Sequence, residues 1–183
     1  MLRAIDGLVF QYYGPDEGDV AIVEDTVHHV VPAMQPRRNT GLQSIWAPAN
    51  SSQRADYAAM LCKALSLHFR MPVKASLAAR STDVAVLKLT IGDHVASYTE
   101  DSSGEFNDFL ESIASKLPID LPGNVQLIPD LRLIVDRDMY LVKPTALRHW
   151  LRSTALADAE QIAAEFVAAA ARRGQEGVVH AGG

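Results

Sequence analysis

The pattern of apolar and polar residues predicts strands in short runs and helices in longer amphipathic stretches. Runs at residues 131–135 and 139–143 predict a hairpin across the acidic turn at 136–138. The run at 84–91 is apolar almost throughout, so we expect a central strand that is buried on both faces. The Gly92-Asp93 pair that follows it predicts a second hairpin, with residues 94–99 returning beside this strand.

The N-terminal third carries β-rich runs separated by turn-forming residues. Four of these runs predict strands, at residues 2–5, 8–13, 20–23 and 27–31. Asp6-Gly7 is a dipeptide typical of a two-residue hairpin turn, and it separates the first two runs. The prolines at 32–50 indicate an irregular loop that contains a short strand at 42–46.

Three longer stretches have apolar residues at the i, i+3, i+4 spacing of an amphipathic helix, at residues 52–68, 105–117 and 154–173. We also expect a short helix at 145–150 and a further strand at 125–128. The last long helix should end at a C-terminal cap made by Arg172, Arg173 and Gly174. The fold class that follows is α+β, with a mixed, mostly antiparallel sheet built from hairpins, three to four helices, and a long helix at the C-terminus.

Length and composition fit an ordinary globular domain, with 183 residues, 48% hydrophobic and 21% charged. We therefore expect one domain over residues 1–174, followed by a flexible tail at 175–183. No apolar run reaches the roughly 20 residues that span a bilayer. Asp6 and Gly7 also interrupt the apolar core that a signal peptide needs. The expected location is the cytoplasm, without membrane contact.

The chain lacks the common signatures of nucleotide binding, zinc binding and serine hydrolysis. Cys62 is the only cysteine, and it lies on the apolar face of a predicted helix, so we interpret it as a core residue rather than a nucleophile. His28 and His29 would point to opposite faces of a predicted strand. Neither His68 nor His94 has a spaced partner for a ligand set. We expect neither a metal nor a cofactor.

Asp136 and Asp138 are the catalytic candidates, because they place two carboxylates on one tight turn. Such a pair can hold a divalent cation with help from phosphate oxygens. The alternative interpretation is an acidic turn that only joins two strands in water.

The most distinctive segment gathers cationic and aromatic side chains close together in a chain of net charge −5. Its members are Lys143, Arg148, His149, Trp150 and Arg152. Tryptophan and arginine are typical hot-spot residues of protein interfaces, and they also suit stacking on bases and contact with phosphates. The alternative is that Trp150 anchors the final helix while the arginines are solvated or paired with Asp158 and Glu160.

The residues around this segment, 140–144, 148–153 and 155–160, resemble the closing segment of small uncharacterised proteins from bacterial restriction and phage-defence loci. The resemblance implies a biological setting. It implies neither an activity nor site residues.

Three hypotheses follow from the sequence. The first is a non-enzymatic accessory subunit that binds a partner protein through the 143–152 surface, in a bacterial defence or nucleic-acid-processing complex. The second is a metal-dependent enzyme of uncommon type, in which Asp136 and Asp138 act with Lys143 or His149 on a phosphate-containing substrate. The third is a direct nucleic-acid-binding module, which requires one surface formed by Arg37, Arg38, Arg148 and Arg152.

Overall fold

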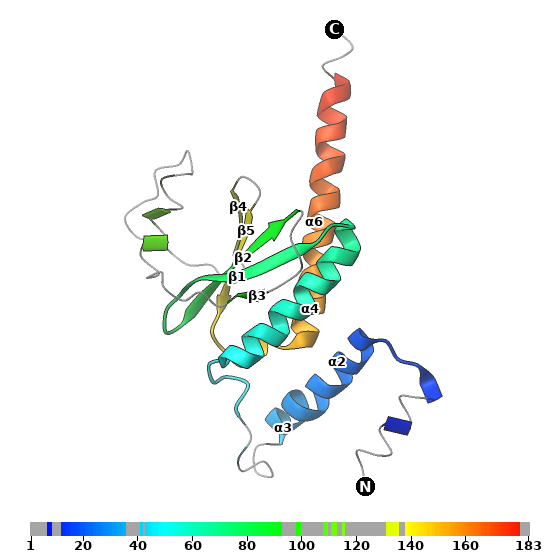
Figure 1. The fold of residues 1–183 in the computed structure, drawn as a ribbon, viewed down its shortest axis with the longest axis vertical. Coiled ribbons are helices and arrows are strands. Elements are labelled where there is room, and N and C mark those ends of the chain that lie inside the picture. Colours follow the sequence, from blue (N-terminus) through cyan, green and yellow to red (C-terminus); the bar gives the residue numbers. More distant parts are fainter. Residues whose placement is uncertain are drawn as a thin grey trace.

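A computed structural model describes residues 7–8, 12–35, 41, 43–92, 98–99, 108–109, 111–112, 115, 131–135 and 138–179. Its strands are β1 (Val73–Arg80), β2 (Val84–Ile91), β3 (Tyr98–Thr99), β4 (Leu131–Val135) and β5 (Asp138–Pro144). The strand order is β3-β1-β2-β5-β4, and all neighbours are antiparallel except β1 and β3 (Figure 1). The expected α+β class, with a mostly antiparallel sheet, is confirmed.

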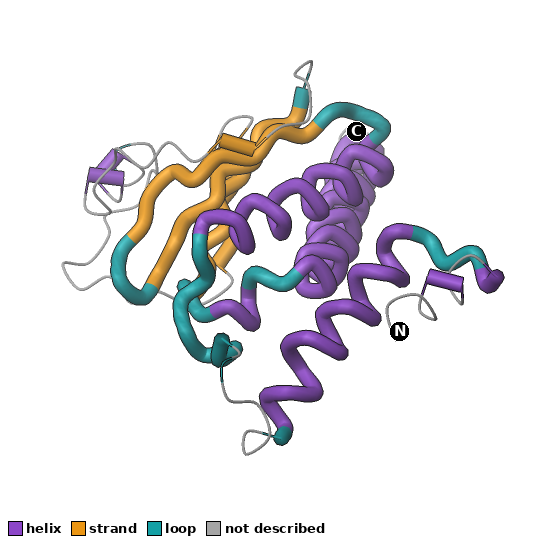
Figure 2. Tube along the Cα trace, turned by 60° about the horizontal axis from the view of Figure 1, so that its bottom comes forward, coloured by secondary structure: helices purple, strands orange, loops and turns teal. Residues whose placement is uncertain are grey.

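Two long helices, α4 (Ser51–Phe69) and α6 (Arg152–Val179), cover one face of the sheet. The N-terminal helices α2 (Glu17–Asp25) and α3 (Val31–Met34) are joined by a π-helical segment, η1 (Thr26–Val30). They lie on the far side of α4 and α6 from the sheet (Figure 2). A single 3-10 turn, η3 (Leu147–His149), connects β5 to α6. The last turns of α6 extend beyond the sheet (Figure 1).

The main core lies between the sheet and the pair α4 and α6. Alternate residues of β1 are buried, as expected for a strand with one face toward helices. They meet apolar residues of β2, β5, α4 and α6, among them Leu87, Leu141, Leu61, Leu65 and Ile162. Burial of these side chains supplies the main favourable free energy of folding.

Local signals fix both ends of α4. Asn50 caps the helix in a reciprocal box, since its side chain accepts from the Gln53 amide and the Gln53 side chain accepts from the Asn50 amide. At the other end Arg70 adopts a left-handed conformation with φ of 53°. The structure thus confirms the helix predicted at 52–68 and extends it by one residue at each end.

The strands expected at residues 20–23 and 27–31 are wrong, because the structure places both runs in α2, η1 and α3. Asp16 and Asp19 form a capping box that starts α2. The buried residues of α2 are Ala21 and Asp25, four positions apart, which is a helical and not a strand spacing. Of the hairpin expected at 2–13, the described residues 7–8 and 12–13 are helical, and the rest lies outside the described residues.

Four further expectations need correction. Strand β1, which pairs with β2 along its length, was not among the predicted strands. β3 runs parallel to β1, so it does not form the hairpin expected after Gly92. α6 continues through Gly174 to Val179, so no cap ends it at Gly174. Described residues 43–47 form no strand, with a turn at 45–46 and a bend at 47, and Pro48 pairs with Ala146 in an isolated bridge.

Other expectations fall wholly or partly outside the described residues. The helix predicted at 105–117 is described only at 108–109 and 111–112, which are helical, and at residue 115. The strand predicted at 125–128, His94, Asp136 and the pair Arg37 and Arg38 lie outside them. In the part of the chain that is described, no helix combines the length and the apolarity needed to cross a bilayer.

The N-terminal helices are held to the domain by a long-range cap. Asp25 is buried, and its Oδ2 accepts a hydrogen bond from the Ser153 amide at 2.7 Å, at the start of α6. Glu24 accepts from the Arg152 guanidinium at 2.6 Å. A residue of α2 therefore satisfies one of the amides that every helix leaves open at its N-terminus.

Asp25→Ala removes the side chain that caps α6. We expect the free energy of unfolding, measured by urea denaturation, to fall by about 1–2 kcal/mol because α6 loses its N-terminal cap. Glu24→Ala is the matched control, since it removes only a partly exposed ion pair with Arg152 and should cost less than about 1 kcal/mol. Equal losses in the two variants would contradict the capping role of Asp25.

Candidate functional site

The segment 143–152 divides into buried and exposed parts. Lys143 and Trp150 are each only 1% exposed, so neither belongs to a surface. Arg148 is exposed, and His149 and Arg152 are partly exposed. The candidate binding surface therefore loses two of its five expected members, because they lie in the core.

Lys143 forms a buried polar cluster with residues from α4 and α6. Its Nζ donates to Oδ2 of Asp158 at 2.5 Å, and the Tyr57 hydroxyl donates to the same oxygen at 2.5 Å. The Lys143 Nζ also lies 4.9 Å from the centroid of the Tyr57 ring. Because a buried charge is costly unless it is paired, this cluster determines how β5, α4 and α6 fit together.

Trp150 braces the junction between β5 and α6. Its indole Nε1 donates to the Pro144 carbonyl at 2.7 Å, and its ring meets the Tyr57 ring edge-on with centroids 5.2 Å apart. This satisfies the only polar atom of the indole inside the core. Trp150 thus packs at the start of the final helix, as the alternative interpretation held, but Arg152 pairs with Glu24 and not with Asp158 or Glu160 as that interpretation also allowed.

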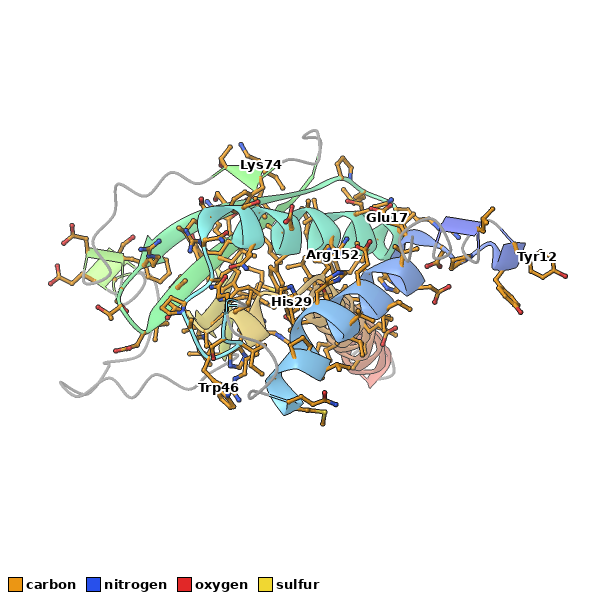
Figure 3. All side chains as sticks on the ribbon, turned by 90° about the horizontal axis from the view of Figure 1, so that it is seen from below. Tyr12, Glu17, His29, Trp46, Lys74 and Arg152 are labelled. Atoms are coloured by element: carbon orange, nitrogen blue, oxygen red, sulfur yellow. The ribbon has the colours of Figure 1, made fainter. Side chains whose placement is uncertain are left out.

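Arg152 faces the N-terminal helices. Its guanidinium pairs with Glu24, and Nε lies 3.8 Å from Asp25 Oδ1. The hydrogen bond to Glu24 is the largest cause of the raised pKa of Arg152. His29 lies near the same cluster, and burial lowers its pKa (Figure 3). Arg152 thus has an internal role at the contact between α2 and α6.

Arg148 is exposed, and it contacts Trp46, a residue that the sequence did not point to. Its guanidinium carbon lies 4.1 Å from the centroid of the Trp46 ring, a cation–π stack, and its Nε donates to His149 Nε2 at 3.0 Å. Trp46 is 63% exposed, and it lies at the edge of the molecule in Figure 3. We call Trp46, Arg148 and His149 the Trp46 surface.

The loop that carries Trp46 is fixed to the end of β5 and to η3. Pro48 forms a β-bridge with Ala146. Three backbone hydrogen bonds join the two segments, from Ala49 N to Thr145 O at 2.8 Å, from Leu147 N to Ala47 O at 2.8 Å and from Arg148 N to Ile45 O at 3.0 Å. The backbone is therefore hydrogen-bonded on both sides of Trp46, at Ile45 and at Ala47.

Of the proposed enzyme site, Asp138 and Lys143 lie apart, and Asp136 lies outside the described residues. Asp138 lies on the sheet face that points away from α4 and α6, where it pairs with Lys88 at 2.7 Å and accepts from Thr90 at 2.6 Å. Lys143 lies on the opposite face of β5, because the two residues are an odd number of positions apart. No group of three or more metal-ligating side chains occurs among the described residues.

The cysteine and the described histidines match no catalytic arrangement. Cys62 is buried in the core, as its position on the apolar helix face indicated. His28 and His29 lie in η1 rather than in a strand, where His28 is exposed and bonds to the Glu24 carbonyl at 2.9 Å. His68 is exposed on α4.

Sequence reasoning missed Trp46. A signal was present, since this tryptophan stands in the proline-rich segment 32–50, where the short strand expected at 42–46 was interpreted without a surface role for it. Comparisons with protein-family models, with curated proteins and with solved structures found no match. A function for this chain is therefore argued from the geometry alone.

The Cys62 thiol should be inert in the folded protein. Burial raises its pKa to about 12, so at about pH 8 fewer than ~1 in 1,000 thiols are ionised. We expect its reaction with a disulfide reagent such as DTNB to be at least ~100-fold slower than that of the urea-unfolded chain. Similar rates in the two states would show that the thiol is accessible.

Asp158→Ala should be strongly destabilising because it leaves the buried Lys143 ammonium without a counter-charge. We expect a loss of about 3–5 kcal/mol in the free energy of unfolding. The double variant Asp158→Leu with Lys143→Met should recover most of that loss, because it removes both charges and keeps apolar volume. If the double variant is less stable than Asp158→Ala, the charged pair itself supplies the stability.

Proposed function

We propose that this protein is a non-enzymatic subunit that binds a partner protein through the Trp46 surface. The observation that carries the proposal is an indole that is 63% exposed and stacked under a guanidinium, on a loop paired with the end of β5. Tryptophan and arginine are the residue types most enriched among interface hot spots. Because the Trp46 ring is mostly exposed, a large part of its apolar area is left for a partner to cover.

The fixed geometry of the Trp46 surface favours binding. A loop that is already paired through its backbone loses little conformational freedom when a partner docks. The Trp46 ring offers a large apolar area with few rotatable bonds. Pre-organisation of this kind lowers the entropic cost of association, which is one of the main terms opposing affinity.

The chemistry of the surface indicates the partner group it would accept. A guanidinium stacked on an indole keeps its N–H edge open to a planar acceptor, and a carboxylate matches that edge with two parallel hydrogen bonds. Within the described residues, no carboxylate pairs with Arg148. We therefore propose an acidic side chain next to an apolar one as the partner's contact.

The two rival functions have less support. An enzyme using Asp138 with Lys143 is disfavoured because these residues lie on opposite faces of β5. A nucleic-acid surface built on Arg148 and Arg152 is disfavoured because Arg152 is engaged by Glu24. Membership of a defence or nucleic-acid-processing complex stays a proposal for the biological setting.

The test compares partner capture by matched variants. Trp46→Ala and Arg148→Ala should fold normally and should lose the same protein from the set recovered from native cells, as measured by quantitative mass spectrometry. Leu67→Ala and Arg80→Ala are the controls, since these residues are similar in type, exposed and placed elsewhere, and they should retain it. The recovered protein is then purified and titrated.

In that titration we expect each Trp46-surface variant to weaken binding about 10- to 100-fold, the range of an interface hot spot. The proposal is overturned if no recovered protein is lost by both Trp46→Ala and Arg148→Ala, or if the purified protein binds both variants as tightly as the unmodified chain. If the recovered material is instead nuclease-sensitive, and its affinity falls steeply with salt, the surface binds nucleic acid and the protein-binding proposal fails.

A further inference from the structure

The outer face of the sheet, turned away from α4 and α6, carries a polar area built by strand register. Lys74 of β1 lies opposite Thr90 of β2, and Thr90 lies opposite Asp138 of β5. In the next row Ser76 lies opposite Lys88. Residues directly opposite each other on neighbouring strands share a face, with Cβ atoms about 5 Å apart. Three strands therefore place their polar side chains together.

These side chains line a hollow of about 520 Å³. Its polar lining comes from β1, β2, β3 and β5, and consists of Lys74, Ser76, Lys88, Thr90, Thr99 and Asp138. Lys74 and Trp46 lie at opposite edges of the molecule in Figure 3, so the hollow is separate from the Trp46 surface. The volume falls within the usual range for small-molecule sites, about 300–1,000 Å³.

The hollow is cationic within an acidic protein. Two lysines face one carboxylate here, whereas the whole chain carries a net charge of −5. Asp138 forms an ion pair with Lys88 at 2.7 Å, and their hydrogen bond raises the pKa of Lys88. Lys74 and Lys88 are diagonal neighbours on β1 and β2, so one anion could contact both of them.

Next to the hollow, the same face of the sheet carries buried apolar side chains, against which Phe109 packs. Tyr140 and Val142 form a second buried cluster with Val86, and the Phe109 ring packs on the Tyr140 ring with centroids 5.3 Å apart. Since Tyr140 is only 7% exposed, it is not available to stack on a base or another flat ligand. Recognition in the hollow therefore depends on charge and hydroxyl groups.

We propose that the hollow binds a small phosphate-bearing molecule, with Lys74 and Lys88 on the phosphate oxygens and the Ser76 and Thr99 hydroxyls donating to the same group. Lysines act as point charges and suit the several oxygens of a phosphate, whereas planar carboxylates favour the fork of arginine. A nucleic-acid backbone is a poorer fit, because it needs an extended cationic track and this site has a surplus of one positive charge.

The experiment titrates the purified full chain with pyrophosphate and with ribose 5-phosphate by calorimetry, and uses ribose as the phosphate-free control. We expect saturable binding of a phosphate-bearing probe with a dissociation constant below about 1 mM, and none with ribose. Lys74→Gln and Lys88→Gln should each weaken it by about 10-fold, since each removes one charge-assisted contact.

Two further variants distinguish a specific site from general charge effects. Asp138→Asn removes the competing carboxylate and should strengthen phosphate binding by at least about threefold. Lys63→Gln changes the net charge as Lys74→Gln does, but it lies on α4 on the other side of the sheet, so it should leave the affinity within about twofold. Circular dichroism checks that each variant is folded.

The proposal is overturned if no phosphate-bearing probe binds, or if Lys63→Gln weakens binding as much as Lys74→Gln. It is also overturned if Asp138→Asn weakens binding while folding normally, since the carboxylate would then be part of a different site. None of these results bears on the Trp46 surface, because partner capture is measured with other variants.

Discussion

The ion pair between Lys143 and Asp158 is the contact on which the arrangement of this fold depends. It joins the sheet to α6, and the Tyr57 hydroxyl brings α4 to the same carboxylate. Separating a buried ammonium from its carboxylate is strongly destabilising, because it leaves an uncompensated charge in the core. A slide of α6 along the sheet would leave both charges unpaired, so the polar cluster specifies the register of the layers.

The surface features are consequences of that register. With α6 fixed, Trp150 fills the corner where β5 ends and bonds to the Pro144 carbonyl. The chain then makes the η3 turn, whose amides pair with the loop that carries Trp46. Arg148 emerges from the same turn above the indole. The position of the Trp46 surface is thus set by residues that pack in the core, through the backbone hydrogen bonds of η3.

The sequence predicted those elements whose apolar pattern has one physical explanation. The β2 run and the hairpin of β4 and β5 were found because continuous apolar runs of strand length have few alternatives. The valine runs near residues 20–31 were assigned to strands because β propensity was given more weight than the capping signal of Asp16 and Asp19. β1 was missed because its small residues, such as Ala75 and Ala79, give a weak pattern.

For the candidate site, the sequence indicated which residue types carry the contacts, but not which of these residues are buried or what they pair with. Nothing local to Lys143 shows that its partner stands fifteen positions later on α6, so a buried lysine was assigned to a surface. The same holds for Arg152, whose partner Glu24 is 128 positions away. Arg148 was correctly placed in an exposed position, while its stacking on Trp46 arises from the pairing of two distant loops, which no spacing rule reveals.

The two tryptophans occupy opposite environments, at 63% and 1% exposure, and they are the only ones in the chain. Indole emission shifts with the polarity around the ring, and a soluble quencher reaches only a ring in contact with solvent. Quenchable red emission therefore originates from Trp46, and protected blue emission from Trp150. Docking at the surface and opening of the core thus have separate optical readouts within the unlabelled chain.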